Sequence, residues 1–181
     1  MFLNKINNIM KKVIIIPVLI LSVLFTFESL SQARKYVLFE HFTNASCTPC
    51  AYQDPIFDSS IVALNAGNIV HITYHTDWPG VDPMNALNPD EVKDRVTYYK
   101  VSGVPHVRML GTRFASGPSG ITQTQLDDAA SESSPIRIKV METENSGTRD
   151  VTITVFSVGD VPDGTYSLRA VAVEREINYF P

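Results

Sequence analysis

The run Tyr36-Val37-Leu38-Phe39-Glu40-His41-Phe42, followed after four residues by Cys47-Thr48-Pro49-Cys50, carries the strongest structural signal in the chain. Its first part is largely apolar and rich in β-forming side chains, which predicts a central strand covered on both faces. Residues 43–46 form a turn, and residues 51–64 have apolar positions typical of a helix. The order predicts a strand–turn–helix unit with both cysteines where the helix begins.

The alternation of strand-like and helix-like patterns continues to about residue 114, and residues 116–134 close the domain with a Gly- and Ser-containing start and a short helix. Residues 75–87 are rich in Pro, Gly, Asp and Asn, and they predict a loop inserted after a second buried strand. Asn88 and Pro89 are typical of a helix start, with an N-cap followed by proline at the first helical position. We assign 34–134 to one α/β domain. Its further elements are a strand at 68–74, a helix at 88–100, a hairpin of 104–110 and 113–115 turning at Gly111-Thr112, and a helix at 122–130.

The last part of the chain changes its period. Residues 136–141, 151–155 and 166–173 alternate polar and apolar side chains and are separated by turn-forming clusters. This predicts an antiparallel meander of the kind that β-sandwiches contain. Because three strands leave one apolar face uncovered, either the β-sandwich domain is truncated or the sheet packs on a partner. We favour the first and expect residues 135–181 to be the start of a β-sandwich domain.

The N-terminal segment has the pattern of an export signal. Lysines precede an apolar run at 13–27, and the small residues Ser31 and Ala33 fit a cleavage site. A membrane anchor is the alternative, but the run is shorter than the roughly 20 residues that a spanning helix needs, and Pro17 interrupts it. We therefore expect residues 1–33 to be a cleaved signal peptide.

The net charge and the number of cysteines limit the classes of function that the chain can have. The chain has two cysteines and a formal net charge of −4. An acidic chain does not have the basic stripe of a nucleic-acid-binding protein. A bond between Cys47 and Cys50 closes almost no chain, so it stabilises the fold little, whereas disulfide scaffolds distribute several cysteines among their loops. A chemically reactive role explains the two cysteines better than a structural disulfide does.

Helix geometry gives the two cysteines different roles. Positions i and i+3 lie on one face of a helix, so Cys47 and Cys50 are close enough to form a disulfide. Unpaired backbone N–H groups and the helix dipole favour an anion at the first position. We expect Cys47 to be the exposed attacking thiolate and Cys50 the deeper, resolving thiol.

These motifs resemble the thioredoxin superfamily in order and spacing. The Pro before the second cysteine, the run Pro55-Ile56-Phe57-Asp58 and the segment Ser102-Gly103-Val104-Pro105 all have counterparts in that family. The resemblance implies a thioredoxin-like fold in which Pro105 is a cis-proline facing the disulfide. It also implies that the backbone of Val104 pairs with substrate, so Val104 and Pro105 are the predicted substrate-binding residues.

The chain departs from the thioredoxin pattern at two positions. Ser46 stands where thioredoxins have a tryptophan, and His41 stands where they have a buried acid. A histidine titrates near neutrality and could move the proton of Cys50. It could equally be a hydrogen-bonded core residue, which is the interpretation that we favour. Trp78 in the insert either covers the redox face or caps local apolar surface.

A narrower resemblance concerns the order of the whole chain. The signal, the CxxC, Tyr74-His75-Thr76-Asp77-Trp78-Pro79, the Gly-Val-Pro segment and the β-rich end are similar to the twenty-eight-kilodalton outer membrane protein family. That resemblance implies a thioredoxin-like domain followed by an immunoglobulin-like one. It also implies export to the periplasm, the outer membrane or the cell surface of a Gram-negative bacterium.

A metal site is the main chemical alternative. Cys47 and Cys50 offer thiolates, and His71 and His75 offer imidazoles. Along a strand, however, those histidines would be about 13 Å apart, which is too far for one zinc ion. Copper bound by the cysteines and one histidine remains an alternative, and we predict no metal and no other cofactor.

Two functions of different classes follow. The first is an envelope thiol–disulfide oxidoreductase acting on thiols or disulfides of exported proteins, with a membrane redox partner as an option. The second is a surface or adhesion protein that keeps the scaffold without turnover. The residues Thr48-Pro49 between the cysteines do not fix the direction of electron transfer.

Overall fold

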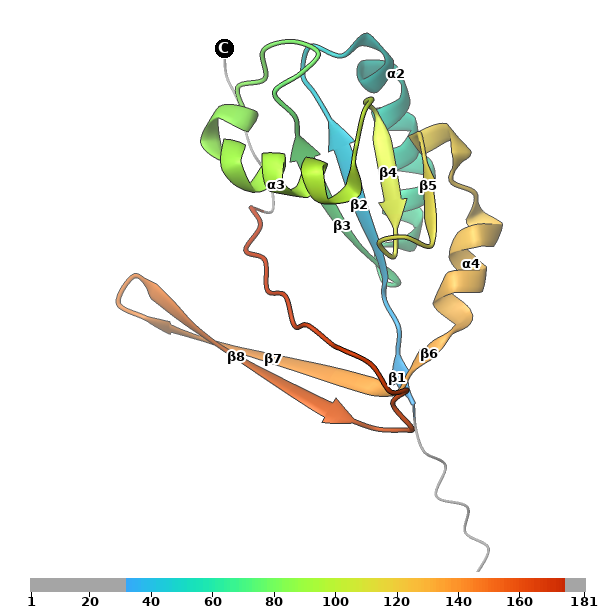
Figure 1. Ribbon diagram of the computed structural model, residues 1–181, viewed down its shortest axis with the longest axis vertical. Helices are drawn as coiled ribbons and strands as arrows, with labels where there is room; N and C mark the ends of the chain where they lie inside the picture. Colours follow the sequence, from blue (N-terminus) through green and yellow to red (C-terminus); the bar gives the residue numbers. More distant parts are fainter. Residues whose placement is uncertain (1–31, 175–181) are drawn as a thin grey trace, which may run out of the picture. The chain divides into compact units, whose positions relative to one another are not determined.

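A computed structural model describes residues 32–174 (Figure 1). The predicted signal peptide falls almost entirely outside this range, so that prediction stays untested. Ala33, the last residue of the predicted signal peptide, belongs to a short strand, β1 (Ala33–Arg34). This strand pairs antiparallel with β6 (Ser133–Ser134). Within residues 32–174, no helix has both the length and the apolar character needed to cross a membrane.

The centre of the fold is a four-stranded mixed sheet with the order β3-β2-β4-β5. β2 is parallel to β3 and antiparallel to β4, and β4 is antiparallel to β5. Both the predicted central strand and the predicted hairpin are present, although the first hairpin strand is shorter than expected and the second begins one residue later. The strands are β2 (Val37–Thr43), β3 (Ile69–His75), β4 (His106–Met109) and β5 (Phe114–Ser116).

A helical crossover joins the parallel strands β2 and β3, as parallel pairing requires. It starts as α2 (Thr48–Phe57), three residues before the predicted helix, because Cys47 occupies the N-cap and proline is accepted in the first turn. Pro55 lies inside α2, and the crossover continues as a π-helical segment (Asp58–Val62) and a 3₁₀ turn (Ala63–Asn65).

Two further helices are present where the sequence predicted helices. α3 (Pro89–Tyr99) has Asn88 at its N-cap position, and it ends at Lys100, which adopts a left-handed backbone conformation. α4 (Gln123–Ser131) begins with a capping box, in which the side chains of Thr122 and Gln125 each accept a backbone hydrogen bond from the other residue.

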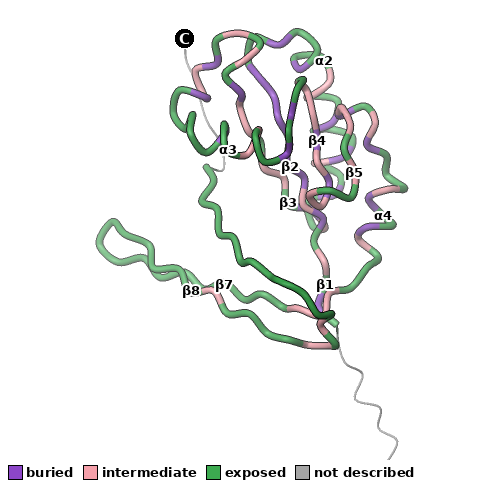
Figure 2. Tube along the Cα trace, in the orientation of Figure 1, coloured by how far each residue is buried: buried purple, intermediate pink, exposed green. Residues whose placement is uncertain are grey.

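Helices cover both faces of the sheet, which explains why β2 is buried along its length (Figure 2). On one face, strand side chains pack against α2, the π-helical segment and α4; on the other, they pack against α3 and the insert. The first core contains Val37, Phe39, Phe57, Ile61, Ile69, Val107, Met109, Ile121, Leu126 and Ala129. The second contains Phe42, Tyr99 and Val101, with Tyr74, Trp78, Val96 and Val104 packed against them.

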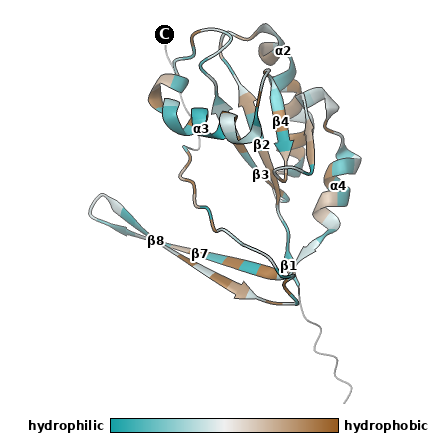
Figure 3. Ribbon diagram, in the orientation of Figure 1, coloured by the Kyte–Doolittle hydropathy of each residue, from teal (hydrophilic) through white to brown (hydrophobic). Residues whose placement is uncertain are grey.

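The C-terminal part forms a two-stranded antiparallel hairpin, β7 (Ile136–Asn145) and β8 (Thr148–Ser157). It turns at Ser146-Gly147, where both residues have positive φ. The predicted third strand at 166–173 is wrong, because these residues form no strand. Alternation alone does not make a strand without a partner for its backbone, and no described segment extends the β7–β8 pair. Both hairpin strands show the alternating hydropathy that led to the prediction (Figure 3).

Core packing gives the first testable prediction. Leu126 is fully buried in the first core, so Leu126→Ala should lower the free energy of unfolding by about 2–5 kcal/mol. Leu87 is exposed, and Leu87→Ala should change it by less than about 0.5 kcal/mol. Urea unfolding of both variants measures the difference, and equal stabilities would contradict this description of the core.

Candidate functional site

The two cysteines form a disulfide at the N-terminus of α2, where β2 ends (Figure 1). Their Cα atoms are 5.2 Å apart, inside the usual range for a disulfide. Cys47 is the N-cap residue, and the backbone N–H of Cys50 donates to its Sγ at 3.1 Å. The predicted strand–turn–helix arrangement of the pair is therefore present.

Burial of the pair differs from the prediction. Cys47 is 3% exposed and Cys50 is 2% exposed, so the expectation that Cys47 is the exposed member is wrong for the disulfide form. The Cys47 Sγ lies 3.6 Å from the carbonyl oxygen of Val104, which belongs to a distant segment. Gly80 packs on the exposed Ser46, so a Cβ at position 80 would come within 2.7 Å of the Ser46 Cβ.

Val104 and Pro105 lie beside the disulfide, although 57 positions separate Val104 from Cys47. The Val104–Pro105 peptide bond is cis, as the resemblance implied. Val104 is half-buried and packs against the second core. The structure therefore brings together all four residues that the sequence singled out for redox chemistry and substrate contact.

The predicted insert is an ordered segment that is hydrogen-bonded to the turn before Cys47. The side-chain amide of Asn44 donates to the carbonyl oxygens of Thr76 and Gly80, at 2.8 and 2.9 Å. The hydroxyl of Ser46 donates to the carbonyl oxygen of Val81 at 2.6 Å. These bonds fix the backbone from which Cys47 projects.

Asp82 is the main link between the insert and this turn. Its Oδ2 accepts hydrogen bonds from the backbone N–H of Ala45 at 2.7 Å and from His75 Nδ1 at 2.8 Å, and its Oδ1 accepts from the N–H of Met84 at 2.9 Å. Burial alone would raise the pKa of Asp82, but these hydrogen bonds and the nearby imidazole lower it below its ordinary value. The ionised form of Asp82 is therefore stabilised at this position between the insert and the turn.

Trp78 packs against the second core together with Tyr74 and Val104. This placement confirms that it caps local apolar surface, which was one of the two predicted roles. A role in gripping substrate stays a prediction. The Trp78–Pro79 bond is also cis.

On the α2 face of the sheet, His41 is a buried, hydrogen-bonded core residue. Only 2% of its side chain is exposed, and its Nε2–H donates to Asp54 Oδ1 at 3.1 Å. The hydroxyl of Thr43 donates to the other oxygen of Asp54. This agrees with the interpretation that we favoured, and a role in proton transfer stays untested.

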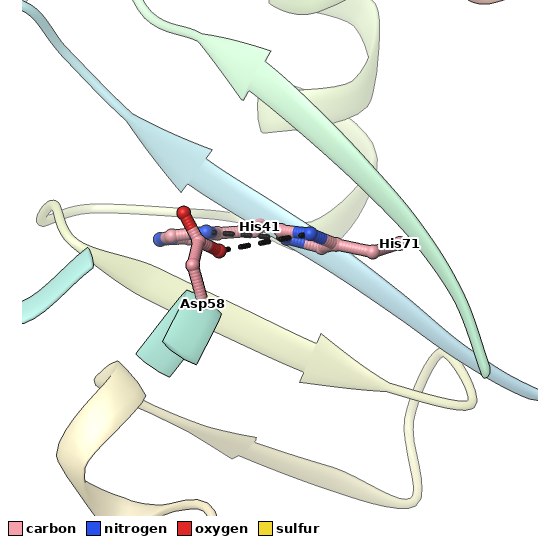
Figure 4. A group of neighbouring side chains, drawn as sticks. All are labelled: His41, Asp58 and His71. Carbon is pink, nitrogen blue, oxygen red and sulfur yellow. Dashed lines mark hydrogen bonds and ion pairs between the residues drawn. The ribbon is translucent and has the colours of Figure 1, made fainter. Parts of the chain in front are cut away.

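His71 lies next to His41 rather than next to His75 (Figure 4). Its Nε2 is 3.4 Å from His41 Nδ1, and its Nδ1 is 3.9 Å from Asp58 Oδ1. Desolvation, helped by the positive potential of His41, lowers the pKa of His71 to about 4. Partial desolvation is the main cause that raises the pKa of the Asp58 carboxyl above its ordinary value. His71 is therefore a neutral imidazole near pH 7.

The sequence did not predict this cluster of His41, Asp58 and His71. We weighed His71 only against its near neighbour His75 and rejected that pair on distance; in the structure His75 is bound to Asp82 in the insert. The signal that was available is strand alternation, since His41 and Phe39 point to one face of β2 and the parallel strand places His71 opposite Phe39.

Comparisons with protein-family models, with curated proteins and with solved structures gave no match to this chain. Its function is therefore argued from the geometry of the site. That geometry consists of a disulfide at a helix N-terminus, a cis-proline segment beside it and an insert that holds the cysteine-bearing turn.

The hydrogen bonds of Asp82 give a second prediction. Asp82→Asn replaces an accepting oxygen with an amide nitrogen that cannot accept, so it should lower the free energy of unfolding by about 1–3 kcal/mol at pH 7. Because the pKa of Asp82 is lower in the folded state, its stabilising contribution is full above the unfolded pKa of about 3.9. The contribution is lost as the pH falls through the folded value, so wild type and variant should converge in acid.

Chemical unfolding at pH 7, 5 and 3 measures this convergence. Asp77→Asn is the matched control, because Asp77 is an exposed carboxylate of the same insert. A difference between wild type and Asp82→Asn that is as large at pH 3 as at pH 7 would contradict the assignment.

Proposed function

We propose that this chain is a thioredoxin-like thiol–disulfide oxidoreductase that acts on exported proteins. The observation that carries the proposal is the position of the Cys47–Cys50 disulfide, at the N-terminus of α2 and beside the cis Val104–Pro105 bond. A strand, a CxxC and a cis-proline segment that meet in space support the proposal more strongly than the CxxC alone.

A purely structural role explains the disulfide poorly. The two cysteines are three positions apart and lie in the same helical turn, which hydrogen bonds already hold. Closing such a short loop removes little entropy from the unfolded chain. The disulfide therefore adds little to folding, whereas its position at a helix N-terminus suits reversible chemistry.

The first chemical step uses Cys47. Once the pair is reduced, the N–H of Cys50 and the N-terminus of α2 stabilise a thiolate on Cys47. This thiolate attacks one sulfur of a substrate disulfide. The substrate S–S bond breaks, a mixed disulfide forms between Cys47 and the substrate, and the leaving sulfur takes up a proton from solvent.

The second step uses Cys50. Its thiol loses a proton, and the resulting thiolate attacks the sulfur of Cys47. The Cys47–Cys50 bond forms, and the second substrate sulfur leaves and is protonated. Two electrons have then passed from the cysteine pair to the substrate, and the reverse sequence oxidises a substrate dithiol.

The substrate would be an extended segment of an exported protein. The backbone of Val104, whose carbonyl oxygen is 3.6 Å from Cys47 Sγ, is the proposed pairing site, with Pro105 beside it. The sequence pattern of the N-terminus and the resemblance to the twenty-eight-kilodalton outer membrane protein family support a place in the bacterial envelope. A membrane redox partner would restore the starting state of the pair.

Turnover tests the proposal directly. Reduction of insulin disulfides in the presence of dithiothreitol should be accelerated by the wild-type chain, and Cys47→Ser should lose this activity by at least about a hundredfold. Cys50→Ser should instead accumulate the mixed disulfide through Cys47, which mass spectrometry detects. The wild type and Cys47→Ser are also compared in an oxidative refolding assay. Equal activity of the two proteins in both assays would contradict the enzyme hypothesis.

The burial of Cys47 favours a second candidate, a surface or adhesion protein that keeps this scaffold without turnover. The exposed apolar side chains of β7 and β8 would then form its binding surface. The insulin and refolding assays separate the two candidates, because the scaffold alone does not exchange disulfides.

A further inference from the structure

We propose that His41, His71 and Asp58 form a binding site for one Zn²⁺ ion. The site lies on the α2 face of the sheet, and it uses neither cysteine (Figure 4). The proposal is therefore independent of the redox function above, and it differs from a metal held by the cysteine pair.

The fold brings the three side chains together from three elements. β2 and β3 are parallel, and their register places His71 opposite Phe39, two residues before His41. Side chains two apart on a strand share a face, so both imidazoles point toward α2. The ring of Phe57 contacts both imidazoles, with centroids 5.5 and 5.7 Å away. Asp58 follows Phe57 and opens the π-helical segment, a kind of irregularity that is frequent at functional sites.

The distance between the imidazole nitrogens fits a shared metal ion better than it fits a hydrogen bond. His41 Nδ1 and His71 Nε2 are 3.4 Å apart. Two ligands at roughly 2.0–2.1 Å from a tetrahedral ion are separated by roughly 3.3–3.4 Å, whereas hydrogen bonds from N–H groups usually span about 2.7–3.2 Å. One oxygen of Asp58 lies within 4.8 Å of donor nitrogens on both histidines. Binding of the ion would require the Asp58 carboxylate to move closer to those nitrogens.

The surroundings of His41 are those of a metal ligand. Its Nε2–H donates to Asp54, and Asp54 is itself held by the hydroxyl of Thr43. In the neutral form of His41, this hydrogen bond keeps the proton on Nε2 and leaves the lone pair on Nδ1, the nitrogen that faces His71. A carboxylate on the far nitrogen of a histidine is the usual outer partner of a zinc ligand, and it increases the basicity of the imidazole.

Exposure and donor chemistry indicate how the ion would enter and which ion fits. The side chain of His41 is 2% exposed, that of His71 is 15% exposed and that of Asp58 is 56% exposed, so solvent reaches the cluster from the Asp58 side. Two imidazoles and one carboxylate are a common zinc set, with water in the fourth position. The charge of the carboxylate also offsets part of the charge of the ion.

Zinc titration of the full chain tests the proposal. The protein is kept oxidised, so that the thiolates are unavailable, and Zn²⁺ binding is measured by calorimetry and by competition with a chromophoric chelator. The wild type should bind one equivalent with a Kd in the micromolar range or tighter. His71→Gln and Asp58→Asn should each weaken binding at least tenfold.

Two controls match the variants in residue type. His75→Gln alters a histidine bound to Asp82, and Asp94→Asn alters an exposed carboxylate of α3, so both should bind zinc as the wild type does. Zinc should also raise the thermal midpoint of the wild type and leave that of His71→Gln unchanged. Asp58 is exposed, so its variant remains informative if the histidine variant does not fold.

The opposite results are equally clear. A wild-type chain that binds no zinc below about 100 μM would overturn the proposal, because a site of this kind must exceed the affinity of scattered surface ligands. Unchanged affinity in both His71→Gln and Asp58→Asn, or loss of affinity in His75→Gln instead, would overturn it as well.

Discussion

The carboxylate of Asp82 joins two parts of the chain whose relative position determines where the Cys47–Cys50 disulfide lies. It accepts hydrogen bonds from the N–H of Ala45, in the turn before Cys47, and from the N–H of Met84, in the insert. Asn44 and Ser46 add bonds from the same turn to the same insert. Because this turn sets where α2 begins, the N-cap position of Cys47 depends on it. The insert is thus a structural support of the cysteine pair.

Strand β2 links this site to the rest of the fold, because its two faces have different tasks. The face toward α2 carries core side chains and then His41, whereas the other face carries Glu40 and Phe42. Glu40 is buried and bound by Arg95 and by the hydroxyl of Tyr99, and a buried charge is tolerated when it is paired in this way. The Cys47–Cys50 disulfide lies where this strand ends and α2 begins. One strand therefore contributes to the position of the disulfide, the histidine cluster and both cores.

Local signals predicted the elements well, and non-local contacts explain what was missed. The apolar run at 36–42 and Asn88 with Pro89 predict structure within a few residues, the pattern at 122–130 predicts a helix, and each element is present. The contact of His41 with His71 spans 30 positions and depends on strand register, which no local pattern encodes. The burial of Cys47 was also missed, and the carbonyl oxygen of Val104 beside its sulfur again comes from a distant segment. The strand predicted at 166–173 failed for the same reason, because a strand also needs a neighbour.

The central claim is that Cys47 and Cys50 form a redox-active pair, and its equilibrium with glutathione tests this most directly. The full chain is equilibrated in glutathione buffers of stepped potential and trapped by alkylation, and the oxidised fraction is measured by mass spectrometry. We predict a reversible two-electron transition between about −270 and −120 mV, the range of disulfide oxidoreductases. A disulfide that resists reduction to below about −300 mV, as structural disulfides do, would contradict the account.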